Sequence, residues 1–121
     1  MATRVLIIDD HDEFRAVARD LLTLRGYAVV GEAACVESAL TQAARLRPHA
    51  VLLDVQLRDG NGFDVARELR DTCPEAAVLI VSACDYGACE DLLRSVGAAG
   101  FLLKPRLVET DLTAYWPPAE D

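Results

Sequence analysis

Five short apolar runs alternate with amphipathic segments along this chain of 121 residues. The runs cover residues 5–8, 28–30, 51–53, 78–81 and 101–103. Continuous runs of β-branched and aliphatic residues are typical of strands buried on both faces of a parallel sheet. Between the runs, apolar residues recur at helical spacing, as at Phe14, Val17 and Leu21. The alternation predicts an α/β fold in which right-handed crossovers place helices on both faces of the sheet.

The length of the chain suits one domain with one sheet. Five β-α units favour a flavodoxin-like, doubly wound sheet of five parallel strands in the order 2-1-3-4-5, flanked by five helices. Cys89, Leu92 and Val96 mark the fourth helix by their spacing. The fifth helix is expected over residues 107–115, and Pro117 and Pro118 follow it. We expect the domain to span residues 1–116 and residues 117–121 to form an acidic tail or the start of a linker.

Two of the apolar runs end in aspartate. The first leads into Asp9 and Asp10, and the third leads into Asp54. Strands one and three are neighbours in the expected order, so the three carboxylates meet at the edge where open α/β sheets bind ligands. At about 4 Å and an effective dielectric constant of 20, each pair of full charges repels by roughly 4 kcal/mol. Such a cluster needs a proton or a divalent cation to be stable.

Polar side chains also follow the fourth and fifth strands. Ser82 comes directly after the fourth run, and Lys104 comes directly after the fifth. Lys104 is the only lysine among the 12 basic residues, and a lysine is a compact ammonium where arginine is a wide, planar group. Carboxylates suit a hard cation such as Mg²⁺, while a hydroxyl and an ammonium supply donors for phosphate oxygens. The sequence therefore predicts a site for a metal ion and a phosphoryl group.

These polar positions, taken in order and on these strands, carry a resemblance to a known family. They are Asp9, Asp10, Asp54, Ser82, Lys104 and Pro105. The set resembles the receiver domain of bacterial two-component response regulators, and the resemblance covers essentially residues 5–115. Phe101, three residues before the lysine, is similar to the switch aromatic of that family, and residues 57–64, with their two glycines, resemble the loop after its acceptor aspartate.

The resemblance implies a mechanism at the carboxylates. Asp54 would be the nucleophile that takes a phosphoryl group from a phosphohistidine. Asp10, Asp54 and the main-chain carbonyl of Gln56 would hold Mg²⁺, and Asp9 would contribute through a water molecule. The chain would promote its own phosphorylation and dephosphorylation without being a turnover enzyme.

The resemblance also implies a switch. Lys104 would contact a phosphate oxygen, Ser82 would move toward the new phosphoryl group, and Phe101 would turn inward into the space released. The Lys104–Pro105 peptide bond would be cis. The face built from the fourth helix, the fifth strand and the fifth helix would then change its surface, although the short fifth helix departs from the family pattern.

Composition and the resemblance together set expectations about partners. A net charge of −8 repels nucleic acid, and no basic cluster is present in the sequence. No apolar stretch approaches the roughly 20 residues of a membrane helix, and the N-terminus lacks the layout of a signal peptide. We expect a cytoplasmic monomer or weak dimer. Its partners would be a histidine kinase or histidine phosphotransfer protein upstream, and a protein target or output domain downstream.

Other interpretations of the same residues stay open at this point. A degenerate receiver that acts as a protein-interaction module without phosphate is the main alternative. A cobalamin-binding domain of the same fold is a remote one, because Phe14 stands where its DxHxxG motif needs glycine. A dehalogenase-like phosphatase would need a second acid at Gln56. We interpret His11, beside the carboxylates, as a solvated loop residue.

Overall fold

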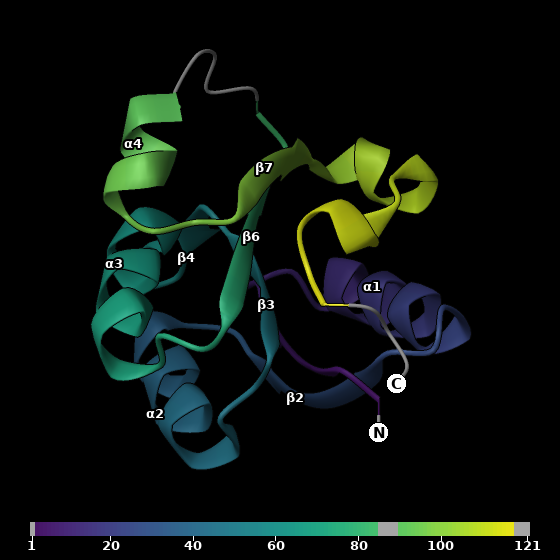
Figure 1. Ribbon diagram of the computed structural model, residues 1–121, viewed down its shortest axis with the longest axis horizontal. Helices are drawn as coiled ribbons and strands as arrows, with labels where there is room; N and C mark the ends of the chain where they lie inside the picture. Colours follow the sequence, from purple (N-terminus) through teal and green to yellow (C-terminus); the bar gives the residue numbers. More distant parts are fainter. Residues whose placement is uncertain (1, 85–89, 118–121) are drawn as a thin grey trace.

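Five parallel strands form the central sheet of the molecule (Figure 1). The computed structural model describes residues 2–84 and 90–117, so Cys89 and most of the expected tail lie outside the described residues. The strands are β1 (Arg4–Ile8), β2 (Ala28–Ala33), β3 (Ala50–Asp54), β6 (Ala77–Ser82) and β7 (Gly100–Leu103). Their order in the sheet is β2-β1-β3-β6-β7, which confirms the predicted order 2-1-3-4-5. Neighbouring strands are paired in parallel throughout this sheet.

Helices cover both faces of the sheet (Figure 1). They are α1 (Asp12–Leu24), α2 (Val36–Leu46), α3 (Gly62–Thr72) and α4 (Glu90–Ser95). Figure 1 shows α1 on one side of the strands together with the C-terminal segment, and α2, α3 and α4 on the other side. Within the described part of the chain, no helix has the length and apolarity needed to cross a bilayer.

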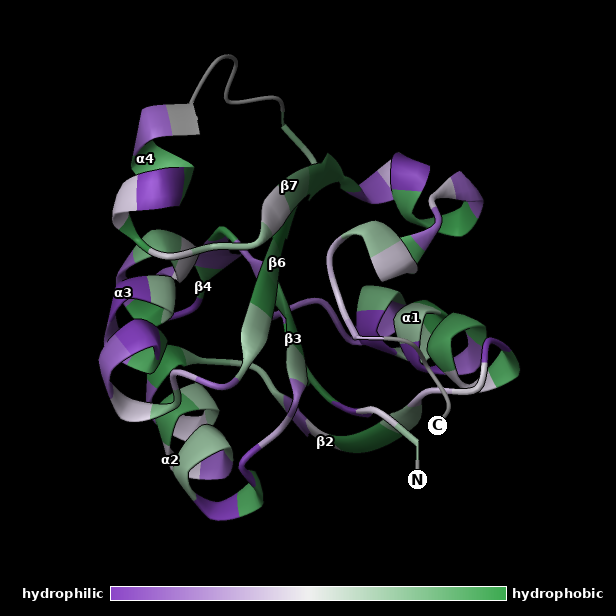
Figure 2. Ribbon diagram, in the orientation of Figure 1, coloured by the Kyte–Doolittle hydropathy of each residue, from purple (hydrophilic) through white to green (hydrophobic). Residues whose placement is uncertain are grey.

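The sheet divides the core into two apolar layers, and Figure 2 shows the apolar residues concentrated in the strands. Leu6 and Ile8 of β1 pack with the apolar residues of α2 and α3, whereas Val5 and Ile7 pack with those of α1. Successive side chains of a strand point to opposite faces, so a strand covered on both sides must be apolar at every position. This requirement explains why the first and third runs in the sequence contain no polar residue until they end.

The prediction of a fifth α-helix over residues 107–115 is wrong. After β7 the chain forms two short 3-10 helices, η1 (Lys104–Glu109) and η2 (Leu112–Ala114), instead of one α-helix. Leu107 and Leu112 are both buried in the α1 layer, but five residues correspond to about 140° around an α-helix, so one helix could not bury both. Between them, the Asp111 side chain accepts a hydrogen bond from the Thr113 N–H and starts η2.

The described residues contain no cis peptide bond, so the Lys104–Pro105 bond is trans. The expectation of a cis bond, which came from the resemblance, is therefore wrong. Pro105 is the second residue of η1. In the first turn of a helix its fixed φ fits the backbone, and its missing N–H leaves no internal hydrogen bond unmade.

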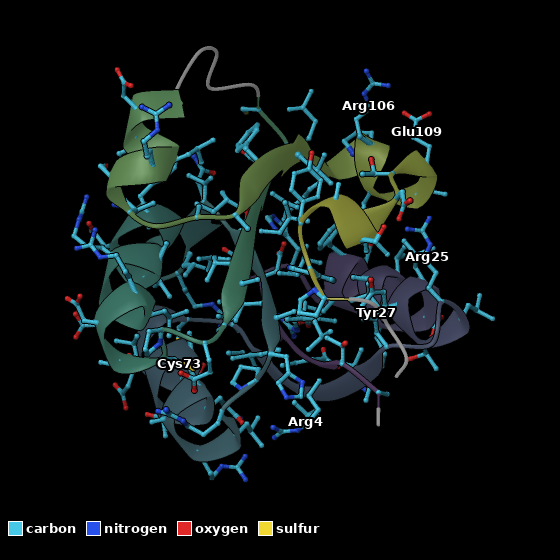
Figure 3. The ribbon with its side chains drawn as sticks, in the orientation of Figure 1. Arg4, Arg25, Tyr27, Cys73, Arg106 and Glu109 are labelled. Carbon is cyan, nitrogen blue, oxygen red and sulfur yellow. The ribbon has the colours of Figure 1, made fainter. Side chains whose placement is uncertain are left out.

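Contacts from the end of α1 hold the C-terminal segment in place. The Arg25 guanidinium donates to the carbonyls of Thr110, at 2.7 Å, and Val108. Tyr27 packs edge-on against buried Trp116, with ring centroids 5.5 Å apart. Figure 3 shows Arg25 and Tyr27 beside this segment. The segment is therefore part of the packed domain.

A small hairpin follows β3, in the region where the sequence analysis expected a loop. Its strands are β4 (Gln56–Leu57) and β5 (Gly60–Asn61). Asp59 at its tip accepts hydrogen bonds from the N–H groups of Val36 and Glu37, at 2.6 and 3.4 Å. Cys35, the residue in the capping position of α2, makes no side-chain cap. The hairpin thus caps a helix more than twenty residues away in the sequence.

Replacing Asp59 with alanine is expected to lower the thermal unfolding midpoint by several degrees, because two N–H groups of α2 lose their acceptor. The same hydrogen bonds lower the pKa of Asp59. The stabilisation is therefore complete above the ordinary pKa of aspartate and is lost as the pH falls through the lowered value. Asp59→Asn keeps an acceptor oxygen and should lose less. Equal midpoints for wild type and Asp59→Ala at neutral pH would show that this cap does not stabilise the fold.

Candidate functional site

The ends of β1 and β3 bring three carboxylates together at one edge of the sheet. Ile8 and Leu53 are paired in the sheet, so Asp9 and Asp54, which follow them, lie side by side. Both side chains are buried, and Asp10 is half-buried beside them. One ligand atom from each carboxylate and one from His11 all lie within 4.8 Å of one another. The expected meeting of the aspartates therefore occurs in the structure.

Lys104 extends from the end of β7 into this cluster. Its Nζ atom lies 2.7 Å from Asp9 Oδ2 and 3.5 Å from Asp54 Oδ2, and the side chain is only 13% exposed. The ammonium also lies 4.5 Å from the centre of the Phe14 ring. A lysine can place a compact charge between two buried carboxylates and an aromatic ring, where a wide guanidinium would need more room. The cluster contains three carboxylates and one ammonium, which contacts two of them, so negative charge is in excess.

The electrostatics of the cluster favour the binding of a cation. Among the described residues, the buried oxygens without a hydrogen-bond partner include Asp9 Oδ2, Asp10 Oδ1 and Asp54 Oδ2. Lys104 Nζ lies 2.7 Å from the first of these oxygens and 3.5 Å from the third and attracts both by charge. Burial raises the pKa of Asp54 and Asp9 raises it further, while Lys104 and the Gln56 N–H oppose the shift. Unpartnered carboxylate oxygens of this kind are the ligands that Mg²⁺ and Ca²⁺ prefer.

The remaining predicted residues lie in different settings. Ser82 is the buried last residue of β6, and its Oγ accepts a hydrogen bond from the Cys84 N–H at 3.1 Å. Phe101 in β7 is partly exposed and packs against the α2 and α3 layer. Gln56, in β4, is exposed, and its N–H hydrogen-bonds with Asp54. The structure thus places Ser82 and Phe101 on the two strands beyond β3.

Gly62 allows α3 to begin directly against the end of β3. A Cβ atom at this position would lie 2.2 Å from the main-chain oxygen of Asp54 and 3.1 Å from Cα of Val55. Both contacts are with backbone, which cannot move aside as a flexible side chain can. Any other residue at position 62 would therefore push α3 away from the end of β3.

His11 is exposed just before α1, as expected of a solvated loop residue, and it also contacts the carboxylates. Its ring is 64% exposed, but Nδ1 lies 3.0 Å from Asp10 Oδ1, 3.1 Å from Asp9 Oδ1 and 3.9 Å from Asp54 Oδ2. His11 occupies the capping position of α1 with an extended backbone, and its side chain makes no cap. Histidine is not among the residues preferred at this position, and its presence there is a signal that the sequence analysis did not use.

Arg15 is a second residue of the site that the sequence analysis missed. Its guanidinium donates to the main-chain carbonyl of Asp9 and, at 3.1 Å, to Glu32 Oε1 in β2. The side chain is 15% exposed. Arg15 therefore ties α1 and β2 to the backbone that carries the first carboxylate.

The fold and the acidic edge together define a class of signalling domain. Residues 5–114 match the model of the response regulator receiver domain, and the chain belongs to this family. Receiver domains are phosphorylation-dependent signalling domains rather than turnover enzymes, they bind a divalent ion at an acidic pocket, and they interact with histidine kinases and output domains. The match confirms the predicted family and favours it over the cobalamin-binding and phosphatase alternatives.

Curated relatives agree with this assignment. The chain is 36% identical over 102 residues to the response regulator GacA of Pseudomonas aeruginosa, covering 84% of the chain and 48% of the relative. It is 33% identical over 105 residues to the chemotaxis protein CheY of Thermotoga maritima, covering 87% of the chain and 88% of the relative. The chain thus spans about half the length of the first relative and most of the second.

Solved structures agree with the fold. The receiver domain of the putative response regulator NarL from Mycobacterium tuberculosis has a TM-score of 0.79 and 35% identity, covering 93% of this chain and 89% of that one. A Burkholderia pseudomallei response regulator with a phosphorylated aspartic acid, a calcium ion and citrate has a TM-score of 0.85 and 29% identity, covering 97% of this chain and 68% of that one. These likenesses confirm the predicted flavodoxin-like sheet.

Proposed function

We propose that Asp54 accepts a phosphoryl group from a phosphohistidine on a histidine kinase or histidine phosphotransfer protein. The observation that carries the proposal is the setting of this carboxylate: it is buried, its Oδ2 has no hydrogen-bond partner, and Lys104 Nζ lies 3.5 Å away. A relative of known structure contains a phosphorylated aspartic acid on the same fold. In this proposal residues 1–116 form the receiver, and residues 117–121 are a tail or the start of a linker.

The chemistry is a phosphoryl transfer between two side chains. An oxygen of Asp54 forms a bond to phosphorus as the bond from phosphorus to the imidazole nitrogen breaks, and that electron pair returns to the imidazole. The product is an acyl phosphate on Asp54. Lys104 lies where it can donate to an oxygen of the transferring group, and this charge-assisted contact stabilises the negative charge.

Asp10, Asp54 and the main-chain carbonyl of Gln56 would hold Mg²⁺, and Asp9 would contribute through a water molecule. The unpartnered oxygens of the three aspartates fit a hard cation. A bound divalent ion neutralises charge on the phosphoryl oxygens during transfer. Lys104 stabilises Asp9 and Asp54 in the absence of that ion.

Ser82 and Phe101 would convert the phosphoryl group into a change of surface. The Ser82 hydroxyl, which now accepts from the Cys84 N–H, would turn to donate to a phosphoryl oxygen. Phe101 would move inward, so that the face of α4, β7 and the η1–η2 segment changes. This face would contact a protein target or an output domain. A net charge of −8 argues against direct contact with nucleic acid. In this proposal the protein is a monomer or weak dimer and acts in the cytoplasm.

Incubation with acetyl phosphate and Mg²⁺ tests the proposal. Intact-mass spectrometry should show one phosphoryl adduct per chain, and a chelator should prevent it. Wild-type protein without any adduct would contradict the proposal and favour the degenerate receiver that acts without phosphate.

Mg²⁺ is expected to stabilise the fold, because it neutralises carboxylates that repel one another in its absence. At a concentration about 100 times the dissociation constant, a ligand that binds only the folded state adds roughly 2.7 kcal/mol to the free energy of unfolding. Thermal unfolding with and without Mg²⁺ measures the effect. In Asp10→Asn the increase should be much smaller, and an unchanged wild-type midpoint would count against a metal site at these residues.

A further inference from the structure

Phe14 lies beside Lys104, but its ring has no role in the chemistry proposed for Asp54. It is the third residue of α1, which starts at Asp12, and it packs on the apolar layer under that helix. The Lys104 Nζ atom lies 4.5 Å from the centre of the ring, a distance typical of a cation–π contact. Both residues also line an open cavity of about 620 Å³ beside Asp10. The ring is therefore part of the surroundings of the ammonium that faces the carboxylates.

The neighbours of the Lys104 ammonium differ in how a bound cation affects them. Asp9 Oδ2, at 2.7 Å, and Asp54 Oδ2, at 3.5 Å, attract the ammonium by charge. In the proposed site the same carboxylates face Mg²⁺, which cancels much of their attraction for a second cation. The Phe14 ring is neutral and is not a metal ligand, so its attraction for the ammonium persists. The ring is thus the neighbour that can hold Lys104 in place when the cation is bound.

The ammonium contact requires a ring at position 14, whereas packing does not. The Lys104 side chain is 13% exposed, and Phe14 is half-buried. Cation–π attraction is larger where water is excluded, because water then competes less for the charge. Leu21 and Leu22 of the same helix pack in the same apolar layer, so this layer accepts leucine. Leucine at position 14 would fill similar space, but it has no π face for the ammonium.

We propose that Phe14 is a positioning residue that holds the Lys104 ammonium where it contacts the transferring phosphoryl group. The inference depends on the proposed phosphorylation of Asp54 and deepens it. The ring touches no reacting atom and acts only through the lysine. In Phe14→Leu the ammonium should spend less time at the phosphoryl oxygens. The rate of adduct formation at saturating Mg²⁺ should therefore fall by roughly 3-fold to 30-fold, the range that corresponds to a partly desolvated cation–π contact.

The single lysine of the chain allows the contact to be observed directly. In untagged protein labelled with ¹³C-lysine, the ε-methylene signal reports on Lys104 alone, and the ring current of Phe14 should shift its protons upfield. The shift should persist when Mg²⁺ is added, persist in Phe14→Tyr and disappear in Phe14→Leu. A lysine signal that is the same in wild type and in a folded Phe14→Leu protein would overturn the inference, whatever the rates of phosphorylation.

The rate of adduct formation with acetyl phosphate, followed by intact mass, tests the role of the contact. Phe14→Tyr keeps the ring and should retain the wild-type rate, whereas Phe14→Leu should be slower. Leu21→Ala is the matched control, because it loses packing in the same apolar layer two turns further along α1, and its rate should be unchanged. In Lys104→Ala protein, the additional change Phe14→Leu should slow the reaction no further, since the two residues act as a pair.

The outcomes separate this inference from the proposed function. Equal rates in wild type and Phe14→Leu would overturn the inference and leave the phosphorylation of Asp54 intact. The same slowing by Phe14→Leu in wild type and in Lys104→Ala would also overturn it, because the ring would then act independently of the lysine. A wild-type protein that forms no adduct would overturn both proposals.

Discussion

Asp54→Asn is expected to abolish the phosphoryl adduct completely, the largest functional effect that we anticipate in this protein. The carboxamide has nearly the same shape as the carboxylate, but it is neutral and a poor nucleophile at phosphorus. Intact-mass spectrometry after incubation with acetyl phosphate and Mg²⁺ measures the loss. Asp71→Asn is the matched control, because Asp71 is an exposed residue of α3 away from the cluster and should leave the adduct unchanged.

The stability of the same variant shows whether it is correctly folded. The pKa of Asp54 is raised, so folding becomes less favourable as the pH rises from the ordinary value of aspartate through the raised one. Asparagine removes this penalty, and Asp54→Asn should unfold at a higher temperature than wild type at neutral pH without metal. A phosphoryl adduct that persists in a folded Asp54→Asn protein would show that another residue is the acceptor.

Lys104→Ala is expected to have the largest effect on stability and a large effect on phosphorylation. The substitution removes the ammonium that lies 2.7 Å from Asp9 and 3.5 Å from Asp54, and leaves both carboxylates buried. Removing one partner of a buried ion pair typically costs about 3–5 kcal/mol. Losing one donor to a transition-state oxygen typically costs about 10²–10³-fold in rate. Chemical denaturation and the rate of adduct formation measure the two effects.

Mg²⁺ separates the two roles of Lys104. A cation at the carboxylates replaces part of the missing positive charge, so Mg²⁺ should stabilise Lys104→Ala more than it stabilises wild type. The rate of phosphorylation should stay low, because the ammonium itself is absent. Lys104→Arg keeps the charge in a wider group and should lie between wild type and Lys104→Ala in both measurements. Wild-type stability and rate in Lys104→Ala would refute both roles.

Much of the site could be predicted because its residues stand at the ends of strands. An apolar run covered on both faces must stay apolar until it leaves the sheet, so Asp9 and Asp54 mark those ends. The parallel order of the strands then places the two residues side by side. Lys104 could be placed by the same reasoning, one strand beyond Ser82.

Features that depend on distant contacts could not be predicted in this way. The side chain of Asp59 caps a helix that begins at Val36, and no local pattern links the two positions. The orientation of His11 depends on where Asp9 and Asp54 place their oxygens. The roles proposed for Ser82 and Phe101 stay predictions.

The alternation of strands and helices and the acidic character of one sheet edge could be inferred from the order of residues alone. These follow from local rules, namely the period of apolar residues and the cost of burying charge. Three features became visible only in the folded chain: two 3-10 helices follow β7, the Lys104–Pro105 bond is trans, and an imidazole lies beside the carboxylates. The 3-10 helices and the position of the imidazole depend on contacts between elements far apart in the chain. Leu107 and Leu112 are buried against α1, and His11 lies near the end of β3, and no short window of sequence contains these contacts.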